Sequence, residues 1–111
     1  MPFIVMDELE KETVTPKYST AYGEVITGDS IEVARLSFAT GTGAVEHAHP
    51  HEQVMYVLSG RLEVRMEGDV AELGPGSAFH ARPNVPHQVT ALEDTLVLSC
   101  KAVIKGVGHK I

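Results

Sequence analysis

Short segments with the character of β-strands, separated by glycine and proline turns, run through most of the chain. In the clearest of them, residues 61–66, Leu62, Val64 and Met66 alternate with charged residues, as in a half-buried strand. Other strands are expected at residues 22–27, 31–39, 45–49, 53–58, 70–73, 78–81, 85–89 and 95–104. No window carries a sustained helical stripe with caps. The pattern predicts an all-β sandwich or barrel, and a jelly-roll barrel fits the number of strands.

Composition narrows the class of protein further. The chain has 111 residues and 43% hydrophobic residues, which suits a single domain over residues 1–111 with one core. Residues 1–20 are expected to form an N-terminal arm or an edge strand. The net charge of −6 argues against nucleic acid and anionic membranes as partners. No apolar run is long enough to span a membrane, so the expected compartment is the cytoplasm. The single cysteine, Cys100, excludes an internal disulfide and is expected to be a small core residue.

Histidines gather where two of these strands are expected to begin or end. His47 and His49 alternate along one predicted strand, so their side chains should project to the same face. Gln53 opens the following strand with the same parity. His87 follows a loop bounded by prolines that would fix its direction. Because neutral imidazole is the commonest protein ligand for metals, these four side chains predict a metal site.

The predicted ligands are His47, His49, Gln53 and His87. Three imidazoles and one amide oxygen suit a divalent Fe, Mn, Ni, Co, Cu or Zn ion, and the residues do not choose among them. With no thiolate or carboxylate ligand, such a site keeps the full positive charge of the ion. Four protein ligands leave room on a five- or six-coordinate ion for water or substrate, as in catalytic sites.

At this point the sequence resembles the small single-domain cupins of the conserved-barrel type. The first matching motif spans residues 41–60 and the second residues 76–91. The residues that carry the match are Gly41, His47, Ala48, His49, Gln53 and Gly60 in the first motif, and Gly76, Pro83, Asn84, Val85, Pro86 and His87 in the second. The resemblance implies a double-sheet jelly-roll barrel (double-stranded β-helix), usually dimeric, with a metal inside it. By position it also implies a metal site made by the four predicted ligands.

The chain departs from the usual cupin pattern at three positions. Gln53 replaces the usual glutamate ligand, Asn84 the usual glycine, and Ala91 the usual trailing asparagine. Some small cupins with glutamine at this place open the ring of unsaturated uronates in pectin and alginate breakdown. That subgroup carries an acidic residue in its last strand, whereas residues 95–111 contain no carboxylate here.

Other polar residues are less strongly indicated as parts of the site. The nearest candidates in sequence for a general base are Glu46, Glu52, His51 and His80. His51 is expected to point to solvent or to support the ligands, and His80 to lie on the barrel rim. His109 lies in a glycine-flanked tail and is expected to be exposed or disordered.

Two further expectations concern side-chain direction. Arg35 is expected on the surface, but if it faced inward it would clamp the carboxylate of an acidic substrate. In the last strand, Lys101 and Lys105 lie opposite a shared apolar face. Met55 has the parity of Gln53 and should line the cavity.

Two functions remain open. The first is a metal-dependent enzyme acting on a small molecule, with either sugar-acid isomerase or lyase chemistry or dioxygenase chemistry. The alternative is a non-catalytic cupin module that binds a metal or a small ligand. A homodimer is expected in either case, because the apolar residues 3–6 and the outer side chains of residues 54–58 need a cover.

Overall fold

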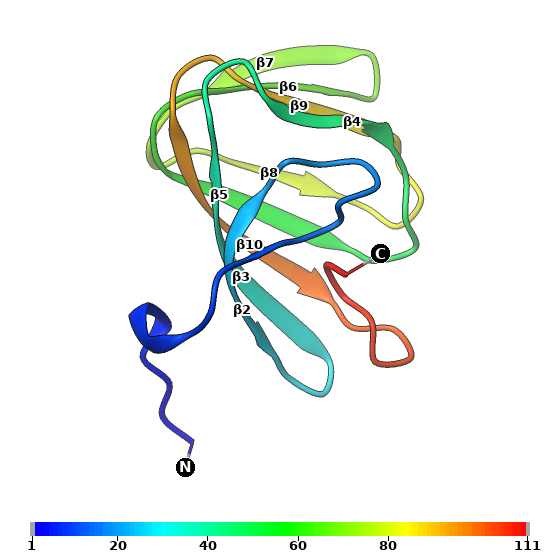
Figure 1. Ribbon diagram of the computed structural model, residues 1–111. Coiled ribbons are helices and arrows are strands. Elements are labelled where there is room, and N and C mark those ends of the chain that lie inside the picture. The colour runs from blue at the N-terminus through cyan, green and yellow to red at the C-terminus, as the bar shows by residue number, and fades with distance from the viewer. Residues whose placement is uncertain (1, 111) are drawn as a thin grey trace.

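The computed structural model describes residues 2–110, which fold into two antiparallel β-sheets packed face to face (Figure 1). One sheet has six strands in the order β1-β2-β3-β10-β5-β8, and the other has four in the order β4-β9-β6-β7. The strands are β1 (Glu12–Thr13), β2 (Tyr22–Thr27), β3 (Ile31–Phe38), β4 (Gly43–His47), β5 (Gln53–Ser59), β6 (Leu62–Met66), β7 (Asp69–Leu73), β8 (Ala78–Ala81), β9 (His87–Ala91) and β10 (Thr95–Ala102). The predicted all-β fold with two sheets is confirmed.

The predicted strands are found, with two differences that affect the histidines. β4 ends at His47, so His49 lies in the loop before β5 rather than on the strand. A register shift in the β4–β9 pairing lies between Ala44 and His47. The prediction that one strand carries both His47 and His49 is therefore wrong, although the two side chains do converge.

The N-terminal residues form no long strand. Between residues 2 and 11 the only helical segment is the 3-10 turn η1 (Met6–Glu8), and Phe3, Ile4 and Val5 before it are exposed. No helix within residues 2–110 is long and apolar enough to cross a membrane.

The side chains between the two sheets fall into layers along the barrel. In the six-stranded sheet, Leu36, Val97 and Val57 are paired across β3, β10 and β5 and form a fully buried apolar row. Two residues further along the same strands, the paired row is Ala34, Ser99 and Met55. The interior therefore becomes more polar toward the C-terminal end of β10.

The next row at that end is polar. Glu32, Lys101 and Gln53 are paired across β3, β10 and β5, and all three side chains are buried. In the opposite sheet, His47, His87 and Met66 lie in one row across β4, β9 and β6. One end of the barrel is thus packed with apolar side chains, while the other gathers polar and ionisable groups.

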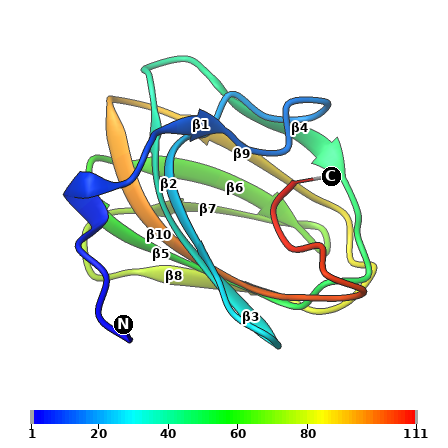
Figure 2. The same cartoon turned by 60° about the horizontal axis from the view of Figure 1, so that its bottom comes forward.

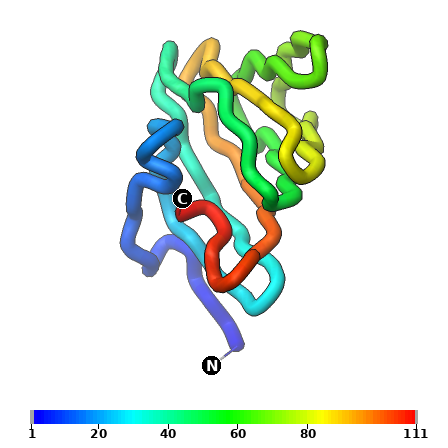
Figure 3. Tube along the Cα trace, turned by 90° about the vertical axis from the view of Figure 1, so that its right-hand side faces the viewer, coloured from blue at the N-terminus to red at the C-terminus, as the bar shows by residue number. Residues whose placement is uncertain are grey.

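The C-terminal tail lies against residues 12–19 beside this polar layer. Figures 2 and 3 show this tail, in red, folded back over the barrel, while the N-terminal end, in dark blue, lies away from it. Thr15 donates a hydrogen bond to the carbonyl of His109, and Lys110 forms a salt bridge with Glu12. The N-terminal segment also reaches the other sheet, since Ser19 pairs with Ala44 of β4. These contacts close the polar end of the barrel on one side.

Candidate metal centre

Three imidazoles meet in the polar end of the barrel. His47 is the last residue of β4, and it pairs with His87, the first residue of β9. His49 lies in the loop between β4 and β5. One ring nitrogen from each lies within 4.8 Å of the others. His49 and His87 are buried, and His47 is half-buried. The structure therefore brings together the three histidines predicted from the sequence.

The loop before His87 explains why this ring is well placed. Asn84 has a left-handed backbone with φ of 65°, a conformation that asparagine tolerates better than most residues. Its N–H donates to the carbonyl of His49. Asn84 can therefore take the place of the usual glycine, and it ties the two histidine-bearing loops together.

Each of the three rings is held by one nitrogen and leaves the other free. The Nδ1 atoms of His47 and His87 lie 2.7 Å and 2.9 Å from the carbonyls of Val45 and Val85. The Nδ1 of His49 lies 2.9 Å from the carbonyl of His51. Because a carbonyl only accepts, each Nδ1 carries the proton and donates, which makes Nε2 the atom that a neutral ring offers to a metal. Metal-binding histidines are commonly oriented by such a hydrogen bond.

Burial leaves one of these nitrogens unpaired. The Nε2 of His49 is buried and has no hydrogen-bond partner among the described residues, an arrangement that is costly unless something else binds it. Burial lowers the pKa of His49 to about 4 and also lowers that of His87. Both rings are therefore neutral at pH 7, the state in which imidazole binds metals. Neutral nitrogen donors of this kind fit a divalent transition metal ion.

Gln53 lies in the same cavity wall, with its amide oriented by a hydrogen-bond relay. Its Nε2 donates to the hydroxyl of Ser99 at 2.9 Å, and that hydroxyl lies 2.7 Å from Nε2 of His109. The Nδ1 of His109 lies 2.6 Å from a carboxylate oxygen of Glu32 and donates to it. His109 Nε2 therefore carries no proton and accepts the hydrogen bond from the Ser99 hydroxyl. Because that hydroxyl has donated its only proton, its oxygen acts as the acceptor toward the amide N–H of Gln53. The relay leaves Oε1 of Gln53 free.

The relay ends on a well-satisfied carboxylate. Glu32 accepts hydrogen bonds from Thr27 and from both the backbone N–H and the ring of His109. Burial alone would raise the pKa of Glu32, but these hydrogen bonds outweigh it and lower the pKa. Burial lowers the pKa of His109 to about 4, although the hydrogen bond to Glu32 opposes this shift. Glu32 is thus ionised and His109 neutral near pH 7.

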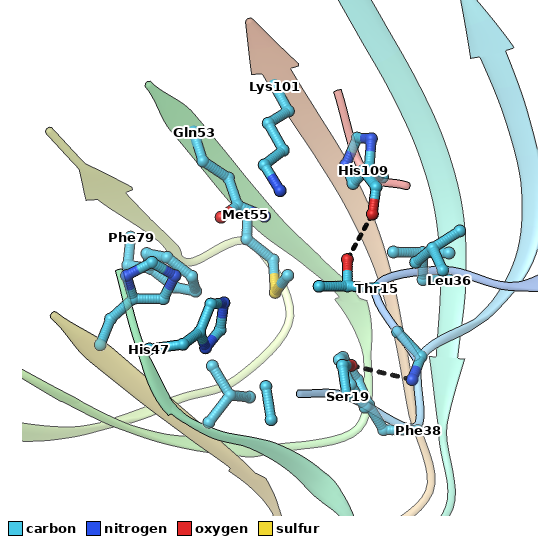
Figure 4. A pocket seen from close by; sticks show the side chains of 15 residues that line it. Thr15, Ser19, Leu36, Phe38, His47, Gln53, Met55, Phe79, Lys101 and His109 are labelled. Atoms are coloured by element: carbon cyan, nitrogen blue, oxygen red, sulfur yellow. Dashed lines mark hydrogen bonds between the residues drawn. The ribbon is translucent and has the colours of Figure 1, made fainter. Parts of the chain in front are cut away.

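Lys101 is the other ionisable group in the wall. It is 2% exposed, and Figure 4 shows its amino group directed into the cavity beside Gln53 and Met55. Burial lowers the pKa of Lys101 to about 8, so its protonated form still predominates at pH 7. The prediction that Met55 lines the cavity is confirmed.

The cavity itself is small and has no acidic lining. Its volume for the centres of water molecules is about 30 Å³, room for about two waters. No aspartate or glutamate is among its described lining residues, which are Val14, Thr15, Ser19, Ala21, Leu36, Phe38, Ala44, His47, Gln53, Met55, Phe79, His87, Val89, Lys101 and His109. Thr15 and His109 belong to the two segments that close the barrel on this side, so these segments restrict access to the centre.

The residues considered as general bases lie elsewhere. Glu46 is exposed, and a carboxylate oxygen of Glu52 lies 2.6 Å from Nε2 of His80, whose side chain is also about half exposed. None of these three lines the cavity. His51 is buried rather than pointing to solvent, and its carbonyl supports the ring of His49.

Three expectations about single residues were wrong or are now decided. His109 was expected to be exposed or disordered, but it is 2% exposed and held by Glu32 and Ser99. Cys100 is only half-buried, because it lies on the outer face of β10. Arg35 points away from the cavity and pairs with Glu24 and Asp7, so it cannot clamp a substrate there.

Sequence reasoning missed that Glu32, Ser99 and Lys101 face the barrel interior. Their alternation with apolar neighbours was visible, but an alternating strand does not reveal which face is inside when that face is polar. One indication was present in the sequence. Val97, Ser99 and Lys101 alternate along one strand and so share a face, and Val97 is fully buried in the structure.

The barrel agrees with comparisons to known proteins. The sequence profile described as "Cupin domain" matches residues 34–108. The chain belongs to this cupin family.

Three individual proteins resemble this chain in sequence or in structure. The chain is 36% identical over 77 residues to the pectin degradation protein KdgF of Dickeya dadantii, covering 68% of this chain and 70% of that protein. The structure of KdgF from a Halomonas species matches with a TM-score of 0.80 and 28% identity, over 92% of this chain and 93% of that one. A cupin described as RmlC-like, from Shewanella frigidimarina, matches with a TM-score of 0.83 at 21% identity, over 95% and 93% of the two chains; this last match supports the fold alone.

Proposed function

We propose that this protein is a metal-dependent enzyme acting on a small sugar acid, in particular by opening the ring of an unsaturated uronate. The observation that carries the proposal is the trio of buried imidazoles, each with Nδ1 satisfied by a carbonyl and Nε2 left for a metal. The similarity to KdgF, a pectin degradation protein, supports this class of substrate. The proposal includes a homodimer in the cytoplasm.

The residues that would hold the ion are His47, His49, His87 and Gln53. A divalent ion bound there supplies Lewis acidity toward a carbonyl or hydroxyl oxygen. Three neutral nitrogens and one amide oxygen add no negative charge, so the ligands would not reduce its charge. Ser99 and His109 keep the amide of Gln53 oriented, and the apolar row beneath excludes water from the barrel interior.

The size of the cavity sets a condition on this function. A cavity with room for about two waters is far below the roughly 300 Å³ or more of typical small-molecule sites. A uronate therefore requires the segment carrying His109, or the one carrying Thr15, to move away. Without such movement the closed cavity favours the second candidate, a non-catalytic module that binds a metal and a very small ligand.

A combined assay separates these functions. Protein purified without an affinity tag is analysed for metal, then assayed with unsaturated uronates before and after chelation, with O₂ uptake recorded in parallel. We expect ring opening that chelator abolishes and added metal restores, with no O₂ consumed. Iron with substrate-dependent O₂ uptake would instead establish dioxygenase chemistry. A metal-loaded protein inactive in both assays would support the non-catalytic module.

A further inference from the structure

Lys101 carries a positive charge into a place where buried charges are rare. Its side chain is 2% exposed and sits between Glu32 and Gln53 in the polar row of the six-stranded sheet. Figure 4 shows its nitrogen entering the cavity between Gln53 and His109. A lysine ammonium is seldom fully buried without a paired acid, because its desolvation is costly.

The natural counterion for Lys101 is already engaged elsewhere. Glu32 is its partner across the β3–β10 pairing, but the Glu32 oxygens accept from Thr27 and His109. Within residues 2–110, Lys101 forms no salt bridge or side-chain hydrogen bond that meets ordinary distance limits. Glu32 and Lys101 are thus both buried on neighbouring strands, but only Glu32 has hydrogen-bond partners.

Among the described lining residues, no negative charge offsets the charge of the ammonium. The described lining contains no carboxylate, and the histidine centre is built from neutral donors that leave a divalent ion's charge undiminished. An ammonium and a metal ion facing one small space favour an anion between or beside them. A neutral sugar would leave the ammonium with only the carboxylate of Glu32 nearby, which forms no salt bridge with it.

We propose that Lys101 is the carboxylate-binding residue of this cavity, and that the molecule bound there is a small organic acid anion. This deepens the proposed function, on which it rests for the nearby metal ion. The contact itself joins the Lys101 ammonium to a carboxylate oxygen and needs no metal. It also takes over the role considered for Arg35, which the structure directs outward.

The closed cavity decides which probe tests the contact. Formate and acetate are small enough for a space of about two waters. Each is titrated into metal-free protein labelled with ¹⁵N, and binding is followed by the amide signals of Ser99, Gln53 and His109. The proteins compared are wild type, Lys101→Met, Lys101→Arg and, as a control, Lys105→Met, whose lysine is exposed.

We expect saturable binding in wild type and Lys105→Met, and at least a tenfold weaker affinity in Lys101→Met. Lys101→Arg should keep more binding than Lys101→Met because it keeps the charge. Affinity in Lys101→Met within twofold of wild type would overturn the proposal. So would the absence of saturable binding in wild type.

A second readout distinguishes a binding lysine from a structural one. Methionine has a similar length and no charge to desolvate, so Lys101→Met should melt at an equal or higher temperature than wild type in anion-free buffer. Wild type should gain melting temperature when formate is added, and the variant should not. A clearly lower melting temperature for Lys101→Met would mean that the lysine holds the barrel together, against the proposal.

The uronate assay separates failure here from failure of the proposed function. If ring opening proceeds with unchanged KM in Lys101→Met, the carboxylate contact is wrong and the enzymatic proposal stands. If wild type binds carboxylates through Lys101 but opens no uronate, the contact is supported and the enzymatic proposal fails.

Discussion

At the scale of single residues, the centre depends on which nitrogen of each histidine is occupied. His47, His49 and His87 all give Nδ1 to a backbone carbonyl two residues away in sequence. A short-range contact of this kind fixes the tautomer without any distant partner. One nitrogen of each ring already lies within 4.8 Å of the others without a metal, which reduces the cost of binding one.

Gln53 depends on more distant residues, and this gives a residue-scale prediction. Replacing Ser99 by alanine removes the acceptor for Gln53 Nε2 and releases the amide. Partners behind a metal ligand are typically worth about 10- to 100-fold in metal affinity. We expect Ser99→Ala to bind Zn²⁺ or Co²⁺ at least about tenfold more weakly in a competition titration with a chromophoric chelator, near the lower end of that range.

Ser37→Ala provides the matched control, because Ser37 is exposed on the outer face of β3. Its affinity should equal that of wild type. Equal affinities in Ser99→Ala and wild type would show that Gln53 does not bind the ion through an oriented amide.

The sequence allowed the histidines to be predicted but not the groups around Lys101, for a physical reason. Two histidines spaced by two residues, with a third after a proline-bounded loop, have few explanations other than a shared metal site. Lys101 and His109, in contrast, look like ordinary surface residues in sequence. Only the pairing of β10 between β3 and β5 turns Lys101 inward, and only the fold of the tail buries His109.

At the scale of elements, β10 shows the limit of hydrophobic patterning. The apolar face formed by Leu96, Leu98 and Cys100 is the outer, half-buried one. The inner face carries Val97, Ser99 and Lys101. In most strands the apolar face is buried and the polar face is exposed, but β10 has polar residues inside and apolar residues outside. The strand itself was therefore predictable from the alternation, while the direction of its two faces was not.

The C-terminal tail depends on one glycine, which gives an element-scale prediction. A Cβ added to Gly108 would lie 2.7 Å from Oε1 and 2.8 Å from Cδ of Glu32. Glu32 cannot give way easily because Thr27 and His109 hold its carboxylate. We expect Gly108→Ala to lose about 1–3 kcal/mol of unfolding free energy through overpacking and to speed hydrogen exchange at the His109 amide.

Gly74→Ala is the control for this substitution, since the nearest atom to its added Cβ is an Arg61 side-chain nitrogen at 3.5 Å. It should leave both measurements near wild type. If Gly108→Ala exchanged its His109 amide at the wild-type rate, the close packing of the tail on Glu32 would not be what keeps the barrel end closed.

At the scale of the whole molecule, the barrel separates stability from chemistry. The apolar rows form one end, and the metal centre, Lys101 and the segments that carry Thr15 and His109 form the other. Loss of a metal ligand should therefore leave the fold intact. The outer face of the six-stranded sheet still exposes Val54, Tyr56 and Leu58, each at least 40% exposed. A homodimer that covers this face remains a prediction, and sedimentation equilibrium tests it.

The most direct test of the metal centre is the metal stoichiometry of wild type and of His49→Ala. Both proteins are purified without a tag, stripped, reloaded with Zn²⁺ or Co²⁺, dialysed and analysed for metal per chain. We expect one ion per wild-type chain and almost none in His49→Ala, with unchanged far-UV circular dichroism because the apolar rows do not involve the ion. A folded His49→Ala protein that retains one tightly bound ion per chain would contradict the assignment of the centre.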